Sequence, residues 1–273
     1  MRTPLFTKHT RDLTRRAVRF GRKHSVQLVW AVLDCPTTIA IAQQVAAELN
    51  VALASLVWDA PELLAELLGL DRFSSSQLLQ SFGKALKASR QIGVVGETMK
   101  EKYDQKYGTN AIIVRHGLND EPLRHQCRTA HDDIAPLIIG FAGTVTSPRE
   151  FETLLQSLDL VEWQIHGRPV VLRLVGSRFV LSSHSKRHIE YFGWRSVTET
   201  ISLLGEADMC YLPQPFSRAE RHLARLSFPT KLSTYIATGR PVILHAPPHA
   251  SVVPFFNRFR FGIWHDTEDR HGL

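Results

Sequence analysis

The chain has 273 residues, which is enough for two domains at about 100–200 residues per domain. Its composition, 44% apolar and 22% charged, is that of a globular protein and excludes a disordered or collagen-like chain. The longest apolar run, Leu28–Leu33, is far shorter than the ~20 residues that a membrane span needs, so no transmembrane helix is predicted.

The first 24 residues are strongly basic. They hold eight Lys or Arg residues and one Asp, which equals the net charge of +7 of the whole chain. Because the excess belongs to one segment, no nucleic-acid site is predicted. Leu13, Ala17 and Phe20 recur at helical spacing, so residues 8–23 are predicted to form a basic amphipathic helix. This helix is either a solvated surface helix or one that binds an anionic membrane surface.

From residue 26 to residue 115, short apolar runs alternate with stretches of helical periodicity. The predicted strands are Val26–Leu33, Val51–Val57, Ile92–Val95 and Ala111–Arg115. The predicted helices between them are Thr37–Leu49, Pro61–Leu68, Ser75–Ser89 and Glu97–Tyr107. Apolar strands that are separated by a helix are typical of a buried parallel sheet.

A polar stretch at residues 117–136 interrupts this alternation, which then resumes. The later strands are predicted at Leu137–Ala142, Pro169–Val175, Ile189–Phe192, Asp208–Leu212 and Pro241–His245. The later helices are predicted at Pro148–Leu160, Val197–Leu204 and Thr230–Thr238. We therefore predict an α/β fold with two Rossmann-like domains, residues 1–120 and 137–273, joined by a linker at 121–136.

The first strand of the second half is followed by a glycine-containing loop and a helix start. Gly143 and Thr144 lie in the loop, Ser147 is a favourable N-cap residue, and Pro148 suits the first helical position. The free N–H groups of a helix N-terminus favour an anion, and Arg149 adds a positive charge in the first turn. The pattern predicts an anion site, although a purely structural turn has the same sequence.

A second cluster begins at Pro229-Thr230-Lys231-Leu232. Thr230 can cap the following helix, and Gly239 can end it in a left-handed conformation before the next strand. Basic residues precede the helix at Arg218, Arg221 and Arg225. An ordinary surface helix with polar caps would give the same pattern.

Together with Tyr235, Ala237 and Gly239-Arg240-Pro241-Val242, this second cluster resembles the donor-binding signature of the family 4 glycosyltransferases. Further landmarks occur in the same order: Gly140–Thr144, Leu174-Val175-Gly176, Phe192-Gly193-Trp194 and Glu206-Ala207-Asp208. The resemblance spans roughly residues 26–264. It implies a GT-B fold, in which two Rossmann-like domains face each other across a cleft. It also implies transfer of a sugar from a nucleotide diphosphate sugar to an acceptor hydroxyl, with retention at the anomeric carbon.

The resemblance also implies roles for single residues. Arg149 and Lys231 are the candidate catalytic cations, which would stabilise the departing diphosphate. The other candidate donor-binding residues are Gly143, Thr144, Trp194, Arg195, Pro229, Thr230 and Thr234. Family members usually have a Glu at position 234, which holds the ribose, and a second Glu at the position of Leu226.

These missing carboxylates leave two alternatives open: a catalytically silent GT-B binding or scaffold protein, and an epimerase that acts on a nucleotide sugar. Relative to the family, the N-terminal domain is expected to be incomplete and the chain to end early. The expected partners are a nucleotide sugar, a glycan or lipid-linked acceptor, and an anionic membrane surface that contacts residues 8–23. No metal and no cofactor are expected. Three widely separated cysteines and the lack of a secretory signal favour the cytoplasm. The basic helix adds the expectation of attachment at the membrane periphery.

Overall fold

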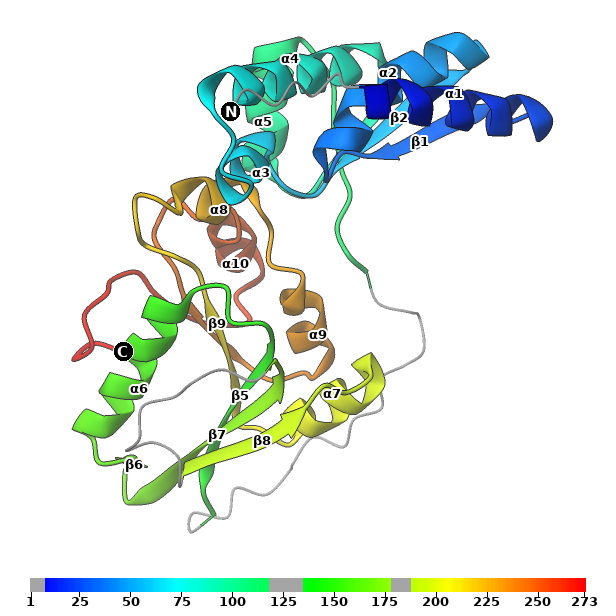
Figure 1. Ribbon diagram of the computed structural model, residues 1–273. Coiled ribbons are helices and arrows are strands. Elements are labelled where there is room, and N and C mark those ends of the chain that lie inside the picture. Colours follow the sequence, from blue (N-terminus) through cyan, green and yellow to red (C-terminus); the bar gives the residue numbers. More distant parts are fainter. Residues whose placement is uncertain (1–7, 118–134, 178–187) are drawn as a thin grey trace. The chain divides into compact units, whose positions relative to one another are not determined.

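The computed structural model of the protein describes residues 8–117, 135–177 and 188–273 (Figure 1). The chain divides into two compact units: unit 1 comprises Met1–Arg115 and Arg225–Phe228, and unit 2 comprises His116–Ala224 and Pro229–Leu273. Each unit has its own parallel sheet and its own hydrophobic core. Almost all of the predicted linker, residues 121–136, lies outside the described residues.

Unit 1 alternates strands and helices as predicted. Its elements are α1 Lys8–Lys23, β1 Leu28–Val32, α2 Pro36–Leu49, β2 Ala52–Val57, α3 Pro61–Leu67, α4 Arg72–Ala88, β3 Ser89–Val94, α5 Glu97–Tyr107 and β4 Ile112–Ile113. The strands are parallel and lie in the order of the chain, β1-β2-β3-β4. Right-handed crossovers that all step in one direction place their helices on one face of the sheet, as α2 and α4 lie in Figure 1.

Helix α1 forms as predicted and packs on α2. Its buried positions follow one helical stripe of mostly small residues: Thr10, Thr14, Val18 and Gly21. A Cβ on Gly21 would lie 2.6 Å from Leu49 Cδ1, so the two helices are close together at this point. Phe20, expected in the apolar stripe, is instead 62% exposed. Leu13 and Ala17 of the predicted apolar stripe are half-buried, so the face that contacts α2 and the predicted stripe are neighbours on the helix.

Unit 2 contains a larger sheet with helices around it. Its elements are β5 Leu137–Gly143, α6 Pro148–Leu160, β6 Gln164–Ile165, β7 Arg168–Gly176, β8 Ile189–Gly193, α7 Val197–Gly205, β9 Met209–Pro213, α9 Lys231–Ala237, β10 Val242–His245, α10 Val253–Phe259 and β11 Gly262–His265. A further helix, α8 Arg221–Leu226, lies across the boundary between the two units. The sequence did not predict β6, α8, α10 or β11.

The strand order in unit 2 reverses at β5. The main sheet runs β11-β10-β9-β5-β7, with β8 beside β7, and these pairs are parallel. The chain therefore extends from β5 to β7 and β8 on one side, and then crosses to β9, β10 and β11 on the other. In open α/β sheets, such a reversal opens a crevice at the carboxyl ends of the two strands between which it occurs, here β5 and β9, where ligands usually bind.

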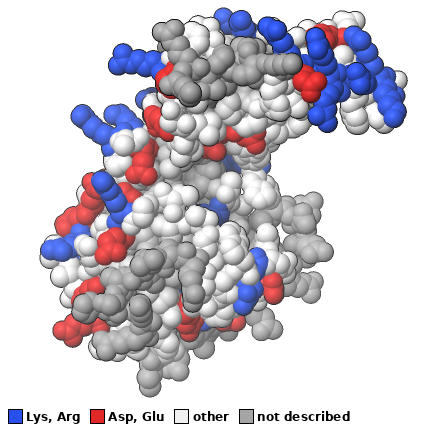
Figure 2. Space-filling model, in the orientation of Figure 1, with Lys and Arg blue, Asp and Glu red and all other residues white. Residues whose placement is uncertain are grey.

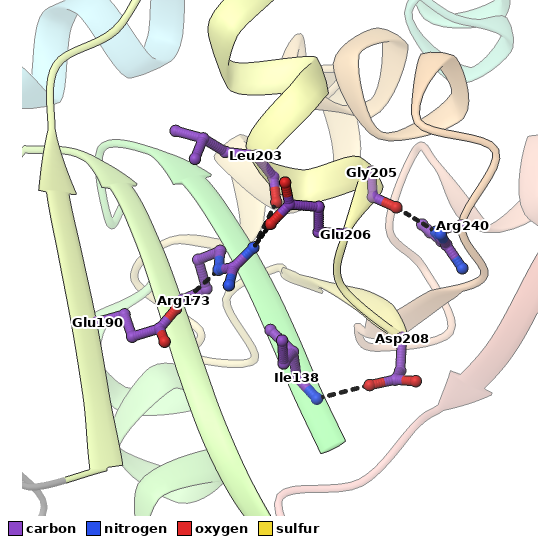
Figure 3. A network of polar contacts seen from close by, with 8 residues as sticks. All are labelled: Ile138, Arg173, Glu190, Leu203, Gly205, Glu206, Asp208 and Arg240. Atoms are coloured by element: carbon purple, nitrogen blue, oxygen red, sulfur yellow. Dashed lines mark hydrogen bonds and ion pairs between the residues drawn. The ribbon is translucent and has the colours of Figure 1, made fainter. Parts of the chain in front are cut away.

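A buried arginine holds the β7–β8 side of this sheet together (Figure 3). Arg173 of β7 is 7% exposed, and its Nε donates to Glu190 of β8 at 2.8 Å. Its Nη1 donates to Glu206 at 2.9 Å and to the Leu203 carbonyl oxygen at 2.9 Å. Three acceptors from β8 and the end of α7 thus compensate the buried guanidinium.

Candidate functional site

The carboxyl ends of β5 and β7 meet at a pair of glycines. Gly143 and Gly176 lie opposite each other in the ladder, with φ values of 86° and 133°. A Cβ on Gly176 would lie 2.6 Å from the Gly143 carbonyl oxygen, so only glycine fits this position. The two backbones therefore present bare peptide groups at this edge, where a ligand can approach closely.

Helix α9 is anchored above the end of β5. Tyr235 is fully buried, and its hydroxyl accepts a hydrogen bond from the Ala142 backbone N–H at 2.9 Å. Lys231 lies one helical turn earlier and therefore on the same face of α9. Its Nζ donates to the Thr144 carbonyl oxygen at 2.9 Å and lies 4.3 Å from the centre of the Phe141 ring. The structure thus brings Gly143, Thr144 and Lys231 together.

The surroundings of Lys231 change its acidity. Burial lowers the pKa of this ammonium from the usual 10.5 to about 8, because the charged form is desolvated. No carboxylate forms an ion pair with Lys231 within the described part of the chain. A half-buried cation without a counter-ion favours an incoming anion, which would supply the missing charge.

The loop that follows β9 is tied to the helix that follows β5. Glu150, in the first turn of α6, is 2% exposed, and its Oε1 accepts the Phe216 backbone N–H at 2.8 Å. Burial raises the pKa of this carboxyl. The Tyr211 hydroxyl of β9 donates to the Glu150 carbonyl oxygen at 2.8 Å and lies 2.7 Å from His245 Nδ1. This network fixes the two loops that border the point of strand reversal.

Sequence reasoning missed Glu150, although a signal was present. Ser147 and Glu150 have the spacing of a capping box, which would direct both side chains to the helix N-terminus. The structure shows another arrangement, because Ser147 makes no capping hydrogen bond and its buried Oγ has no hydrogen-bond partner among the described residues. The expected side-chain cap at Ser147 was therefore wrong. Thr230 likewise occupies the N-cap position of α9 without a capping bond.

The remaining predicted residues lie at or near the same edge. Arg149 is exposed in the first turn of α6, and Thr234 is half-buried on α9. Trp194 is 68% exposed directly after β8, where the neighbouring Arg195 donates to its carbonyl oxygen at 2.9 Å. Pro229 precedes α9 and is half-buried. The contacts of these residues with a donor are predictions.

Leu226, where the resemblance would place a second Glu, has a structural role. It is 1% exposed and belongs to the hydrophobic core of unit 1. A buried leucine in a packed core cannot hold a ribose. In the described part of the chain, no group of three or more His, Cys, Asp and Glu side chains is arranged to hold a metal ion. The described helices include none that is both long and apolar enough to cross a membrane.

Comparison with known proteins gives a likeness in fold. No protein-family model matches the chain, and a search of curated sequences found no match. The structure is similar to that of Anabaena HepE in complex with UDP, with a TM-score of 0.63 and 14% identity over 95% of this chain and 70% of HepE. A sucrose-phosphate synthase from Thermosynechococcus elongatus gives a TM-score of 0.61 and 14% identity over 94% of this chain and 65% of its own.

A third similar structure is the α,α-trehalose 6-phosphate synthase of Burkholderia multivorans. Its TM-score is 0.61 and its identity 11%, over 94% of this chain and 65% of the synthase. Likeness at such identities shows the fold alone. It confirms the predicted α/β fold of the GT-B class, with parallel sheets in both units.

Proposed function

We propose that the protein is a retaining glycosyltransferase whose unit 2 binds a nucleotide diphosphate sugar. The observation that supports this best is the position of Lys231, whose Nζ lies 2.9 Å from the Thr144 carbonyl oxygen, just after β5, the strand at which the strand order reverses. HepE, which shares the fold, was crystallised with UDP and with UDP-glucose. UDP-glucose is therefore the first donor to test, with released UDP as the readout and the anomeric configuration of the product read by NMR.

The chemistry requires that negative charge be stabilised as the diphosphate leaves. Cations and N–H groups that are already in place stabilise such charge most in the transition state. Lys231 would contact the diphosphate from α9, and Arg149 would contact it from the first turn of α6. The peptide groups of the loop after Gly143 would complete the site. Trp194 and Arg195 would border the nucleobase at the end of β8.

A nucleotide-binding protein without transfer activity is the second candidate. It is favoured by Thr234 and Leu226, which stand where two carboxylates are usual, and Leu226 is committed to the core of unit 1. Both candidates bind a nucleotide diphosphate in unit 2. They differ in whether a sugar is transferred, so the UDP-glucose assay separates them.

Position 234 offers a test of how the ribose is held. Thr234→Val is expected to weaken UDP binding by roughly 2- to 10-fold, because a typical hydrogen bond contributes about 0.5–1.5 kcal/mol. Thr234→Glu should strengthen binding, since a carboxylate forms stronger charge-assisted bonds to hydroxyl groups. Isothermal titration calorimetry measures both. Unchanged affinity in both variants would show that residue 234 does not contact the ribose.

We also propose that the protein works in the cytoplasm at an anionic membrane surface, which α1 contacts. Lys and Arg side chains gather over α1 in Figure 2, where Arg11, Arg15, Arg16 and Arg19 are all exposed. The exposed Phe20 ring adds an apolar contact on a helix whose small residues already pack on α2. The family resemblance, with its lipid-linked acceptors, agrees with this location.

Changing Arg15, Arg16 and Arg19 to Gln together should reduce binding to anionic vesicles by roughly 100-fold, at about 1 kcal/mol for each charge. Binding of the parent protein should also fall steeply with salt, because exposed charges are screened over about 8 Å at physiological ionic strength. Vesicle sedimentation with neutral and anionic lipid measures both effects. Equal binding to the two kinds of vesicle would leave α1 as a plain surface helix.

A further inference from the structure

Unit 1 contains a second basic surface, which is separate from α1. A groove of about 700 Å³ runs between α4 and α5. Five polar residues among those that line it from α4 recur at intervals of three or four and form a stripe along that helix: Arg72, Ser76, Gln80, Lys84 and Lys87. Lys106 and Tyr107 line the groove from the C-terminal end of α5.

The groove is shaped by packed residues. A Cβ on Gly83 would lie 2.8 Å from Tyr107 Cε1, so Gly83 allows the ring to reach the α4 backbone. The same ring packs edge-on against the buried Phe82, with 6.0 Å between ring centres. The separation of the two helices is therefore set by the core, and the groove exists without any rearrangement.

The charges that line the groove are all positive. None of its lining residues is acidic, and its four cations, Arg72, Lys84, Lys87 and Lys106, form no ion pair with a described residue. Other lysines of α5 are paired: Lys100 with Asp104 at 2.6 Å, and Lys102 with Glu62 at 2.7 Å.

The acids nearest to the groove are bound to other groups: Glu62, whose charge acts on Lys106, is paired with Lys102. Asp71, the acid next to Arg72, caps α4 by accepting the Ser74 backbone N–H at 2.8 Å. Lys84 and Lys87 are three residues apart on one helix, where like charges repel each other. An anionic partner would relieve this repulsion.

Three apolar side chains close in sequence to Leu70, a residue that lines the groove, are exposed. Leu67 is 74% exposed, Leu68 54% and Phe73 48%. These residues are within three positions of Leu70, which lines the groove. A small soluble anion would leave them in water. A lipid surface would accept the apolar side chains and supply phosphates to the cations, as at other interfacial helices.

We propose that the groove between α4 and α5 binds the phosphate headgroups of anionic phospholipids, with Leu67, Leu68 and Phe73 inserted among the acyl chains. This surface shares no residue with α1, although both α1 and α4 pack on α2. The proposal is also independent of the proposed sugar transfer, because the experiment that tests it measures only the binding of lipid vesicles.

The test uses the full chain and vesicles of phosphatidylcholine, with or without phosphatidylglycerol. The triple change Lys84→Gln, Lys87→Gln and Lys106→Gln should lower binding to phosphatidylglycerol vesicles by roughly 100-fold, at about fivefold for each charge. The double variant Leu67→Ser and Phe73→Ser should also bind these vesicles more weakly, but its binding should depend on salt as that of the parent does. The control is Arg90→Gln, Arg258→Gln and Arg270→Gln, which removes the same charge from exposed positions outside the groove and should bind like the parent.

Circular dichroism and the melting temperature establish that each variant is folded. Equal losses in the groove triple and in the control would overturn the headgroup site, because net charge alone would then explain binding. Unchanged vesicle binding by the groove triple would overturn it as well. Calorimetric titration with glycerol 1-phosphate tests whether the groove binds a soluble phosphate instead of a lipid headgroup. If this soluble anion binds the groove tightly and the vesicles do not bind, the groove is a site for a soluble phosphate.

Discussion

Replacing Lys231 by Ala is expected to weaken the binding of a nucleotide diphosphate by roughly 10- to 100-fold, because a charged hydrogen bond contributes about 1.5–3 kcal/mol. Binding of the nucleoside should change little, since the ammonium lies on the Thr144 loop, where the diphosphate is proposed to bind. If the protein is a transferase, kcat should fall by about 10²–10³, as for the loss of one preorganised donor. Titration calorimetry with UDP and uridine measures the two affinities.

The acidity of Lys231 adds a pH signature to this result. With a pKa of about 8, the ammonium is charged below pH 8 and loses its charge as the pH rises through that value. UDP affinity should therefore decline above pH 8, well below the usual 10.5 of a lysine. Lys231→Arg is the matched control, because its guanidinium stays charged and should remove the decline. Equal UDP and uridine losses in the Ala variant would place Lys231 away from the diphosphate.

Arg149→Ala should give a smaller loss of UDP affinity than Lys231→Ala. Both cations are proposed to contact the diphosphate, but Arg149 is exposed and its charge is screened by water. The same calorimetric titration compares them. An Arg149 effect larger than that of Lys231 would assign the main cation of the site to α6.

Arg173→Ala is expected to cost unit 2 about 2–4 kcal/mol of unfolding free energy, because it opens a void in β7 and leaves two carboxylates without their shared cation. Arg173→Met fills most of that volume with apolar atoms and should cost only about 1–2 kcal/mol, since a buried ion pair often differs little from a hydrophobic replacement. Urea unfolding followed by circular dichroism measures both changes.

Glu206→Ala serves as the control for this prediction. Its side chain is 63% exposed, so its bond to Arg173 is screened by water and its loss should cost less than about 1 kcal/mol. If Arg173→Ala is no more destabilising than Glu206→Ala, the buried guanidinium contributes nothing to the β7–β8 side of the sheet.

Elements with strong end signals could be predicted from the sequence to the residue. Helix α5 follows Gly96 and ends before Gly108, which adopts a left-handed φ of 67°. Helix α6 begins at Pro148, a residue suited to the first helical position. Both observed spans, Glu97–Tyr107 and Pro148–Leu160, are the predicted ones.

Elements whose patterns are short or unusual could not be predicted. Strand β11 lies at a sheet edge with Ile263 69% exposed, so it lacks the continuous apolar run of a buried strand. Its Gly262 is required because an added Cβ would overlap the Val242 carbonyl oxygen, a contact visible only in three dimensions. Helix α10 is short, and no polar capping residue marks its start, since Val252 occupies the N-cap position.

The residues of the candidate site likewise include some that the sequence predicted and some that it did not. Thr144 and Lys231 are 87 residues apart in the sequence, and only the family resemblance assigned them to one site before the structure showed their hydrogen bond. The role of Glu150 could not be predicted, because its hydrogen-bond partner, the Phe216 N–H, is 66 residues away in a loop without a motif. The predicted cap at Ser147 was wrong because the spacing of residues does not show that the Ser147 side chain is buried after β5.

The most direct test of nucleotide binding by unit 2 is a thermal-shift measurement with UDP, GDP, ADP and dTDP, on the parent protein and on Lys231→Ala. A ligand at 100 times its Kd stabilises the native state by about 2.7 kcal/mol, or roughly 5–10 °C for a domain of this size. We expect one nucleoside diphosphate to raise the parent's melting temperature by such an amount, with most of the rise lost in Lys231→Ala. No shift with any of the four, or an equal shift in both proteins, would contradict a diphosphate site at Lys231.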